Sequence, residues 1–424
     1  MLDIKYIREN PEKVKKGVSA KQIEPKIVDE LIVKYDKWTQ TLQEYEKLRQ
    51  RRNEIAKEGK FSQEGKDLKD KLSEAEKNNY EAWEEYSKAE DKMPNLPAED
   101  VKEGKSDKEN KAIYQVGKIS TRMFTTRDHL ELGELLDIVD IKRAAKVSGT
   151  RFAYLKNKAV ILEFALVQYA FTVLMTEGFT PIIPPVLINE EITKGLGYWD
   201  SPPDEAGLTG NEDYYLVREP SENKNFYLVG TAEHSILPMH KDEVFSKNEL
   251  PKRYVGFSSA FRREAGSYGK DTRGILRVHQ FDKVEMVSFT TEEEDDSEQK
   301  ILLKLEEKFW QELGIPYQVV EIVSGNLGFP IARKYDIEAW IPSESKYREV
   351  TSCSTTTDFQ ARRLNIKYND KNEKKFVHIL NGTAFAIGRT IIAILENFQE
   401  EDGTVIIPEV LRKYTGFEKI SPKV

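Results

Sequence analysis

The chain has 424 residues, of which 39% are apolar and 33% are charged, and its formal net charge is −8. This length supports two or three domains with a large core. The acidic balance argues against a surface that is basic throughout and holds nucleic acid non-specifically, although it leaves room for local basic patches.

The N-terminal stretch MLDIKYIREN lacks the basic region and apolar core of a signal peptide. We find no run of about 18 apolar residues, and therefore expect no membrane span. Cys353 is the only cysteine, so an internal disulfide cannot form. These features favour a cytoplasmic protein.

Two apolar ladders in the N-terminal quarter predict a helical hairpin. The first runs through Leu31, Tyr35, Trp38, Leu42, Tyr45 and Leu48. The second runs through Leu68, Leu72, Ala75, Ala82, Tyr86, Ala89 and Met93, with Asn79 filling the gap. Steps of three and four are those of a coiled-coil seam, and the short polar stretch 57–66 requires the helices to be antiparallel. Each helix would have about 28 residues, which gives an arm of about 40 Å over residues 27–93.

The tip of this arm carries a cluster of basic side chains, namely Lys47, Arg49, Arg51, Arg52 and Lys57. Such a cluster favours a partner that bears phosphate, although neighbouring glutamates dilute it. A coiled coil that serves only as a dimerisation element or spacer is the alternative. The stretch 93–111, with two prolines and many charges, is typical of a linker. We therefore expect a helical domain over 1–105 and a second domain over 106–424.

The second domain has the pattern of an α+β fold with an antiparallel sheet. An amphipathic helix is predicted over 152–176 and another around Ile301, Leu305 and Phe309. The intervening and following segments are mostly extended, at 226–230, 253–261, 277–289 and 335–342. Strands that mostly follow one another, with helices interspersed, suggest this class.

The segment 261–287 is a predicted hairpin with an unusually charged face. Alternation along its second strand places Arg277, His279, Phe281, Lys283 and Glu285 on one side, and Val278, Gln280, Val284 and Met286 on the other. Arg262 and Glu264 share a side of the first strand. A solvated, salt-bridged face would not explain Phe281. An aromatic ring beside arginines suits a nucleotide, because the ring can stack on a base and a guanidinium can clamp a phosphate.

The sequence contains neither GxxxxGK[ST] nor GxGxxG after a strand, so a nucleotide must be held by the sheet itself. The hairpin FRREAGSYGKDTRGILRVHQFDKVEMV resembles motif 2 of the class II aminoacyl-tRNA synthetases. Residues 381–398, NGTAFAIGRTIIAILENF, resemble motif 3, and residues 178–188, GFTPIIPPVLI, resemble motif 1 with its proline at Pro184 or Pro185.

Within the class, the chain is most similar to the seryl-tRNA synthetase family. The stretches that carry this similarity are GTAEH at 230–234, YREVTSCS at 347–354 and DFQARR at 358–363, together with the helical arm. The resemblance implies a catalytic domain built on an antiparallel sheet with flanking helices. It also implies synthesis of seryl-adenylate from L-serine and ATP with Mg²⁺, and transfer of the seryl group to the 3′ end of tRNA(Ser), and of tRNA(Sec) as well.

The family's serine-binding and catalytic residues map onto individual positions of this chain. Arg262, Glu349 and Arg389 would be catalytic, and Arg262 would bridge the serine carboxylate and the ATP α-phosphate. Thr231 and Glu233 would hold the serine ammonium. The remaining serine contacts would come from Glu285 and Thr383, which read the hydroxyl, and from Asn381. This chain has Thr383 and Ala384 where many relatives have serine and glycine, and GTAEH where PTAEV is commoner.

The resemblance also assigns the ATP site. The implied contacts are Arg262, Arg263, Glu264, Val278, Phe281, Glu349, Val350, Thr351, Ser352 and Arg389. Glu264 would hold the adenine, Phe281 would stack on one face of it, and Arg389 would lie on the other side toward the γ-phosphate. Glu349 and Ser352 would hold Mg²⁺ between the α- and β-phosphates, and oxygen ligands suit this cation.

The partners implied are tRNA and a second copy of the chain. Arg49, Arg51 and Arg52 on the arm would contact the long variable arm of tRNA(Ser), and Arg273 in the motif 2 loop would meet the tRNA end. Motif 1 would form a homodimer in which one subunit's arm serves tRNA charged on the other. Two alternatives remain: a related ligase with another amino acid or acceptor, and an inactive RNA-binding relative.

Overall fold

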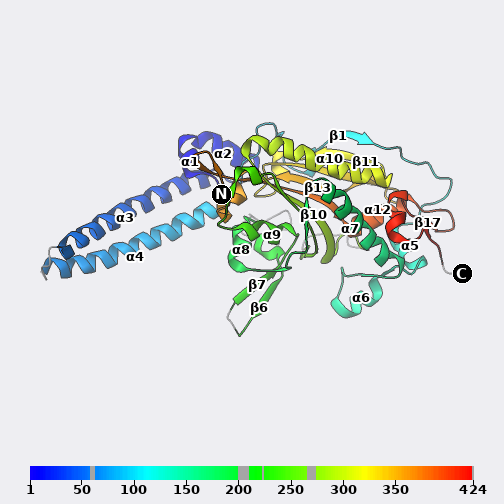
Figure 1. The fold of residues 1–424 in the computed structure, drawn as a ribbon, viewed down its shortest axis with the longest axis horizontal. Helices are drawn as coiled ribbons and strands as arrows, with labels where there is room; N and C mark the ends of the chain where they lie inside the picture. The colour runs from blue at the N-terminus through cyan, green and yellow to red at the C-terminus, as the bar shows by residue number, and fades with distance from the viewer. Residues whose placement is uncertain (58–62, 199–209, 222–223, 265–273, 423–424) are drawn as a thin grey trace. The chain divides into compact units, whose positions relative to one another are not determined.

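The computed structural model describes residues 1–57, 63–198, 210–221, 224–264 and 274–422 (Figure 1). Contacts divide the chain into two compact units, Met1–Leu96 and Pro97–Val424. The helices of the first unit are α1 (Ile4–Glu9), α2 (Pro11–Ala20), α3 (Lys26–Lys57) and α4 (Gln63–Asp91).

The predicted arm is confirmed as the pair α3 and α4, which lie side by side in Figure 1. Their seam is apolar and aromatic, as the ladders required. The Trp38 ring stacks on Tyr86 with 5.2 Å between ring centroids. At Asn79, a polar position of the seam, the Thr41 hydroxyl lies 3.4 Å from Asn79 Oδ1. The predicted turn between the helices lies largely outside the described residues.

The stretch that follows the arm was predicted to be a linker, but its residues from Pro97 onward belong to the second unit and part of them pack against the rest of that unit. Ala98 N donates to Ala332 O at 2.9 Å, and the carbonyl of Lys102 accepts from Ser324 N at 2.9 Å. Asp100 pairs with Arg333 at 2.9 Å. Prolines and charges disfavour regular structure without preventing a segment from packing, so the sequence pattern missed these contacts.

The second unit is built around an eight-stranded sheet in the order β1-β11-β12-β13-β16-β10-β9-β4. Every neighbouring pair is antiparallel except β4 and β9. The strands are β1 (Lys111–Val116), β4 (Thr180–Ile182), β9 (Lys252–Phe261), β10 (Gln280–Thr290), β11 (Tyr317–Glu321), β12 (Arg333–Ile341), β13 (Lys346–Thr355) and β16 (His378–Ala386). The predicted α+β class is confirmed.

Three helices cover one face of this sheet through the largest hydrophobic core, as Figure 1 shows. They are α7 (Lys158–Thr176), α10 (Asp295–Leu313) and α12 (Ile387–Asn397). Val284 and Met286 of β10 and Leu302 of α10 are completely buried in that core. The alternation predicted for β10 therefore holds from Phe281 onward, because these residues face the helices and their neighbours face the opposite side.

Helix α7 is long and apolar enough to cross a membrane, with 19 residues and a mean hydropathy of 1.8. The helix contains no unbroken run of about 18 apolar residues, because Glu163, Gln168 and Thr172 lie within it, and it meets the criterion by mean hydropathy and length only. Half of the helix is buried inside the structure, as in the core helix of a soluble protein.

Smaller elements complete the second unit. The minor strands are β2 (Val139–Asp140), β3 (Tyr154–Leu155), β5 (Leu187–Asn189), β6 (Leu216–Glu219), β7 (Lys224–Leu228), β8 (Val244–Ser246), β14 (Lys367–Asp370), β15 (Glu373–Phe376), β17 (Val405–Ile406) and β18 (Lys419–Ile420). The remaining α-helices are α5 (His129–Leu135), α6 (Ile141–Ser148), α8 (Glu190–Gly195), α9 (Glu233–Ile236), α11 (Phe359–Leu364) and α13 (Glu409–Thr415). Of these, α9 and α11 bring side chains to the functional site.

Candidate active site

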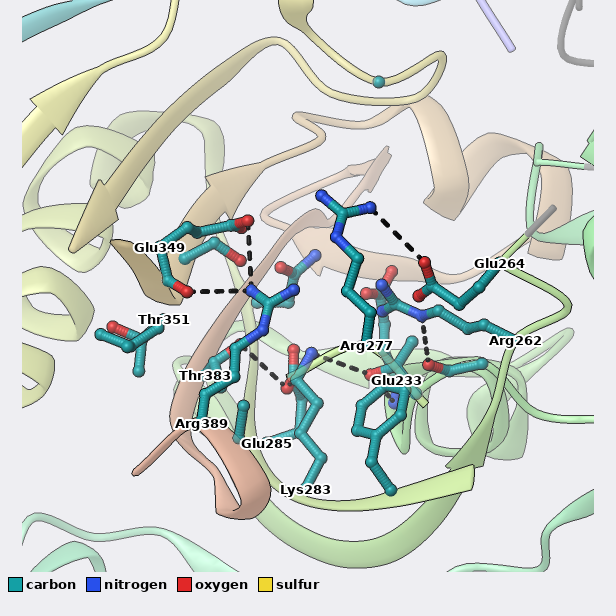
Figure 2. Close-up of a pocket in the computed structure, with 18 of the residues that line it drawn as sticks. Glu233, Arg262, Glu264, Arg277, Lys283, Glu285, Glu349, Thr351, Thr383 and Arg389 are labelled. Carbon is teal, nitrogen blue, oxygen red and sulfur yellow. Dashed lines mark hydrogen bonds and ion pairs between the residues drawn. The ribbon is translucent and has the colours of Figure 1, made fainter. Parts of the chain in front are cut away.

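A cavity of about 470 Å³ lies on the face of the large sheet that the core helices leave uncovered (Figure 2). Phe281, Lys283 and Glu285 of β10 form part of its floor. Strands β13 and β16 and the start of α12 supply further lining residues, among them Glu349, Thr383 and Arg389. The cavity therefore joins three segments that are far apart in sequence.

Most of the predicted site residues line this one cavity. They are Thr231, Glu233, Arg262, Glu264, Val278, Phe281, Glu285, Glu349, Val350, Thr351, Ser352, Asn381, Thr383 and Arg389. Arg263 is exposed and does not line it. Arg273 lies outside the described residues. Arg49, Arg51 and Arg52 are exposed on α3 of the arm.

One end of the cavity is a compact polar pocket centred on Glu285. Thr383 donates its hydroxyl to Glu285 Oε2 at 3.3 Å. Lys283 Nζ lies 2.5 Å from the same oxygen and 3.4 Å from the Thr231 hydroxyl. Burial raises the pKa of Glu285 to about 7, and the Lys283 ammonium opposes that rise. The pocket thus offers a small hydroxyl both acceptors and donors.

Glu233, at the start of α9, is a second buried carboxylate in this pocket. Its Oε1 accepts from Gln360 Nε2 at 3.2 Å and from the Tyr198 hydroxyl at 3.3 Å. Burial raises the pKa of Glu233, whereas these two donors and the Lys283 and Arg262 cations oppose the rise. A buried carboxylate is a suitable partner for an ammonium group.

The chain has GTAEH at 230–234 where PTAEV is commoner, and the backbone N–H of Gly230 makes a contact in the structure. The Gly230 N–H, which a proline would lack, donates to His234 Nδ1 at 3.2 Å. His234 packs between the rings of Tyr198 and Tyr214, with centroids 5.3 Å and 5.5 Å away. Burial lowers the pKa of His234 to about 3, so its imidazole is neutral at physiological pH.

The motif 2 hairpin presents an aromatic ring and two arginines to the cavity. The Arg262 guanidinium lies over the Phe281 ring at 5.3 Å from its centroid, and its Nε donates to Gly230 O at 3.2 Å. Arg277 lies 3.6 Å from Glu264 (Figure 2). Glu264 has a positive φ of 45°, which re-aims the chain as the strand ends. Val278 also lines the cavity and β10 begins only at Gln280, so the alternation predicted for 277–279 is wrong.

The opposite end of the cavity holds a cluster of charges. Arg389 Nη1 donates to the Glu349 carbonyl at 3.0 Å and to its carboxylate Oε2 at 3.2 Å. Lys334 Nζ lies 3.6 Å from the other carboxylate oxygen, Oε1. The enclosed position would raise the pKa of Glu349, but Lys334 and Arg389 outweigh this and lower it to about 2. Glu349 is therefore ionised at neutral pH.

This end fits a hard cation bound mainly through a phosphate ligand. Glu349 provides an ionised carboxylate and Ser352 a hydroxyl beside it on the lining. Within the described residues there is no group of three histidine, cysteine or acidic side chains that could hold a metal by itself. Mg²⁺ commonly uses one or two carboxylates and takes its remaining ligands from substrate phosphates and water.

Sequence reasoning assigned no role to several side chains that the structure places at the site. Lys283 was put on the correct face; its contact with Glu285 lies within β10, whereas its contact with Thr231 crosses from the strand to a loop. Lys334 precedes the predicted strand at 335–342, and Gln360 lies within the quoted DFQARR stretch. Their roles depend on partners distant in sequence, which a local pattern does not specify.

Comparison with known proteins agrees with this geometry. The model of the seryl-tRNA synthetase N-terminal domain matches residues 1–97, and that of the tRNA synthetase class II core domain (G, H, P, S and T) matches residues 215–398. The serine–tRNA ligase of Dictyoglomus turgidum is 42% identical over all of both chains. That of Pyrococcus horikoshii is 41% identical over all of this chain and 98% of its own length.

Two solved structures have the same fold along the whole chain. The P. horikoshii seryl-tRNA synthetase complexed with ATP superposes with a TM-score of 0.89 at 40% identity, covering 100% of both chains. The Naegleria fowleri cytoplasmic serine–tRNA ligase in complex with AMP gives 0.87 at 31% identity, covering 100% of this chain and 99% of that one. Full-length identity and both domain models lead to one conclusion: the chain belongs to the seryl-tRNA synthetase family of class II aminoacyl-tRNA synthetases.

Proposed function

We infer that this protein activates L-serine with ATP to form seryl-adenylate and then transfers the seryl group to tRNA(Ser). The observation that carries this inference is the division of one cavity into two ends. A polar pocket around Glu285, Thr383 and Glu233 suits a small hydroxylated amino acid. A cationic end with Arg262 and Arg389 suits the phosphates of ATP.

The first step needs charge neutralisation more than proton transfer. A serine carboxylate oxygen attacks the α-phosphorus, the bond to the β-phosphate oxygen breaks, and pyrophosphate leaves with that electron pair. The nucleophile is already ionised, so no general base is required. Two anions must instead be brought together, and fixed cations in an enclosed site do this most effectively. Arg262, which lines the cavity with its guanidinium over the Phe281 ring, would contact both reactants.

Mg²⁺ would be held by Glu349 and Ser352 together with phosphate oxygens of ATP. When bound, it would neutralise phosphate charge. Arg389 pairs with Glu349 in the structure. We propose that Arg389 turns to the γ-phosphate end when ATP binds, which releases Glu349 as a ligand. Glu264, Phe281 and Val278 would hold the adenine, and Arg263 would assist from outside the cavity.

Charging of tRNA is the direct test of this function. The protein is incubated with radiolabelled serine, ATP, Mg²⁺ and a tRNA(Ser) transcript, and acid-precipitable label is counted. We expect label to accumulate on tRNA(Ser) and to be absent with a tRNA for another amino acid. Label from a different amino acid, or none on any tRNA, would contradict the proposal.

The unit Met1–Leu96 is proposed to bind tRNA through its arm. Arg49, Arg51 and Arg52 are exposed on α3, and together they offer phosphate contacts on one helix. A helical arm would recognise an RNA duplex by its shape and its phosphate backbone, because protein side chains cannot reach the base edges in the deep groove of the RNA. Arg273 is proposed to meet the acceptor end.

Replacing Arg49 and Arg51 together by alanine is expected to raise the tRNA concentration needed for half-maximal charging about tenfold. The slope of log tRNA affinity against log salt concentration should also become shallower by about one unit for each phosphate contact that is lost. Adenylate formation, followed by ATP–pyrophosphate exchange, should be unchanged because the cavity is untouched. Lys142→Ala with Lys146→Ala removes the same charge from α6 and is the matched control. Equal loss of both activities in the arm variant would refute the assignment.

We propose a homodimer that uses motif 1. The half of α7 that is not buried carries an apolar stripe at helical spacing, with Ile161 44%, Phe164 58% and Met175 55% exposed. Ile183, directly after β4, is 81% exposed. Exposed apolar side chains gathered on one helix and the following strand end favour an interaction site, and a second copy is the occupant that the family resemblance implies.

Light scattering of the wild-type protein is expected to give twice the chain mass of 49.0 kDa. Phe164→Glu should give monomers, because a carboxylate cannot be buried without a partner. Val147→Glu alters another exposed apolar residue, on α6, and should leave the dimer intact. A wild-type monomer that charges tRNA would contradict the proposed interface. It would also contradict the proposal that the arm of one subunit binds the tRNA that is charged on the other subunit.

Two further assignments rest on family resemblance. We propose that tRNA(Sec) is charged with serine by the same reaction. We also propose a cytoplasmic location, which the single buried thiol of Cys353 supports because it cannot form an internal disulfide.

A further inference from the structure

Gln360 is a fully buried side chain that does not line the cavity yet contacts a residue that does. It lies on α11, the short helix that follows β13. Its Nε2 donates to Glu233 Oε1 and to Leu196 O, both at 3.2 Å. Its Oε1 accepts from the Thr356 hydroxyl at 3.1 Å. Two acceptors at the nitrogen and one donor at the oxygen fix which way the amide points.

Glu233 is held on one side only. Its Oε1 accepts from both Gln360 and Tyr198, whereas no hydrogen bond from the described residues reaches Oε2. The carboxylate is 3% exposed, at the serine end of the cavity beside Lys283 (Figure 2). A carboxylate fixed through one oxygen presents the other in a defined direction, so the second oxygen is available to a ligand.

The glutamine amide carries no charge, and this affects how Glu233 can bind an ammonium group. A lysine or arginine at this place would neutralise Glu233 and compete with an ammonium ligand. A carboxylate would force the two acids to share a proton, because like charges at this distance cannot both be ionised readily. Only a neutral donor leaves a single, oriented negative charge.

We propose that Gln360 is a positioning residue for the amino-acid substrate, which holds Glu233 through Oε1 so that Oε2 receives the substrate ammonium. This inference rests on the proposed assignment of Glu233 to that ammonium. Gln360 acts through Glu233 and not on the reacting atoms. Its loss should therefore weaken serine binding more than ATP binding.

The test is serine-dependent ATP–pyrophosphate exchange with Gln360→Met and Gln360→Glu, measured from pH 6 to pH 9. Gln360→Met keeps the volume and loses the donor, and its serine KM should rise about 10- to 100-fold at every pH, the effect of losing a hydrogen bond to a charged group. The KM for ATP should change by less than about twofold, within the context dependence of such effects.

Gln360→Glu supplies the pH signature. At low pH the two carboxyls share one proton, which restores a donor to Oε1, so the serine KM should approach the wild-type value. As pH rises this shared proton is lost, and the serine KM should climb away from the wild-type value. A merely structural role would not produce this dependence. The pH dependence of Gln360→Glu also tests the positioning role if the Gln360→Met protein does not fold.

Gln299 is the matched control, a buried glutamine on α10 outside the cavity. Its Nε2 donates to Arg333 O at 3.2 Å and its Oε1 accepts from Arg333 Nε at 2.7 Å. Gln299→Met should lower thermal stability without a selective change in serine KM. If the Gln360 variants behave as Gln299→Met does, the positioning role is refuted and the proposed function stands. If the wild-type protein shows no exchange with serine, both the positioning role and the proposed function are refuted.

Discussion

Replacing Arg389 by methionine is expected to slow serine-dependent ATP–pyrophosphate exchange about 10³-fold. Arg389 lines the cavity and is the α12 side chain that reaches its cationic end. Once ATP has drawn Arg389 to its phosphates, a cation held at developing phosphate charge contributes about 3–4 kcal/mol of transition-state stabilisation, because the water-poor site strengthens the interaction during the reaction. The loss should fall on kcat and on the KM for ATP, with the KM for serine nearly unchanged.

Arg348 provides the comparison for that measurement. It is a similarly half-buried arginine paired with a glutamate, since its Nε lies 2.7 Å from Glu344, but it does not line the cavity. Arg348→Met should cost some stability and leave the exchange rate within about twofold of wild type. Equal effects of the two substitutions would show that Arg389 supports the fold and does not contact ATP.

The substitution Glu285→Gln is expected to lower kcat/KM for serine by about 10²-fold or more and to destabilise the protein by about 3–5 kcal/mol. The functional loss follows because the carboxylate that accepts the serine hydroxyl is gone. The loss of stability has a different cause. Lys283, whose side chain is 10% exposed, would lose its carboxylate partner in a buried site, and breaking a buried ion pair on one side is costly.

The double variant Glu285→Gln with Lys283→Met separates these effects. Removing both charges eliminates the unpaired ammonium, so thermal unfolding should return toward the wild-type midpoint. Serine activation should stay low, because the hydroxyl-reading carboxylate is still absent. Recovery of serine activity together with stability would mean that Glu285 has only a structural role.

The arm and the composition of the motif 2 face were predictable because their patterns are local. Trp38 and Tyr86 each belong to a ladder in which an apolar residue recurs every three or four positions. This spacing by itself places the apolar side chains on one face of each helix, where they pack. Phe281, Lys283 and Glu285 alternate along a strand that is paired on both sides, so one rule sufficed for their direction.

The arrangement of the site depends on pairings that periodicity does not encode. Glu285 lies opposite Thr383 and Cys353 lies opposite Gly382, in registers that bring β13, β16 and β10 together. The positions of Lys334 and Gln360 follow from that sheet order. Resemblance to a family assigned Thr231 and Arg389 to the site, and both line the cavity, whereas the physical patterns alone reached only the hairpin.

Two sequence interpretations failed for identifiable physical reasons. The segment after Leu96 has prolines and charges, but it packs within the second unit through backbone hydrogen bonds and the pair Asp100–Arg333, which composition does not reveal. The alternation predicted for 277–279 failed because β10 begins only at Gln280, so the strand period does not apply to those residues and Val278 lines the cavity.

Amino-acid-dependent ATP–pyrophosphate exchange, run without tRNA over all the standard amino acids, tests the central claim most directly. The geometry around Glu285 and Thr383 predicts exchange with serine alone, with alanine at least about 10⁴-fold poorer because it would leave buried polar groups unpaired. Exchange driven by another amino acid would contradict the assignment of this pocket. Absence of exchange with any amino acid would contradict the enzymatic activity itself.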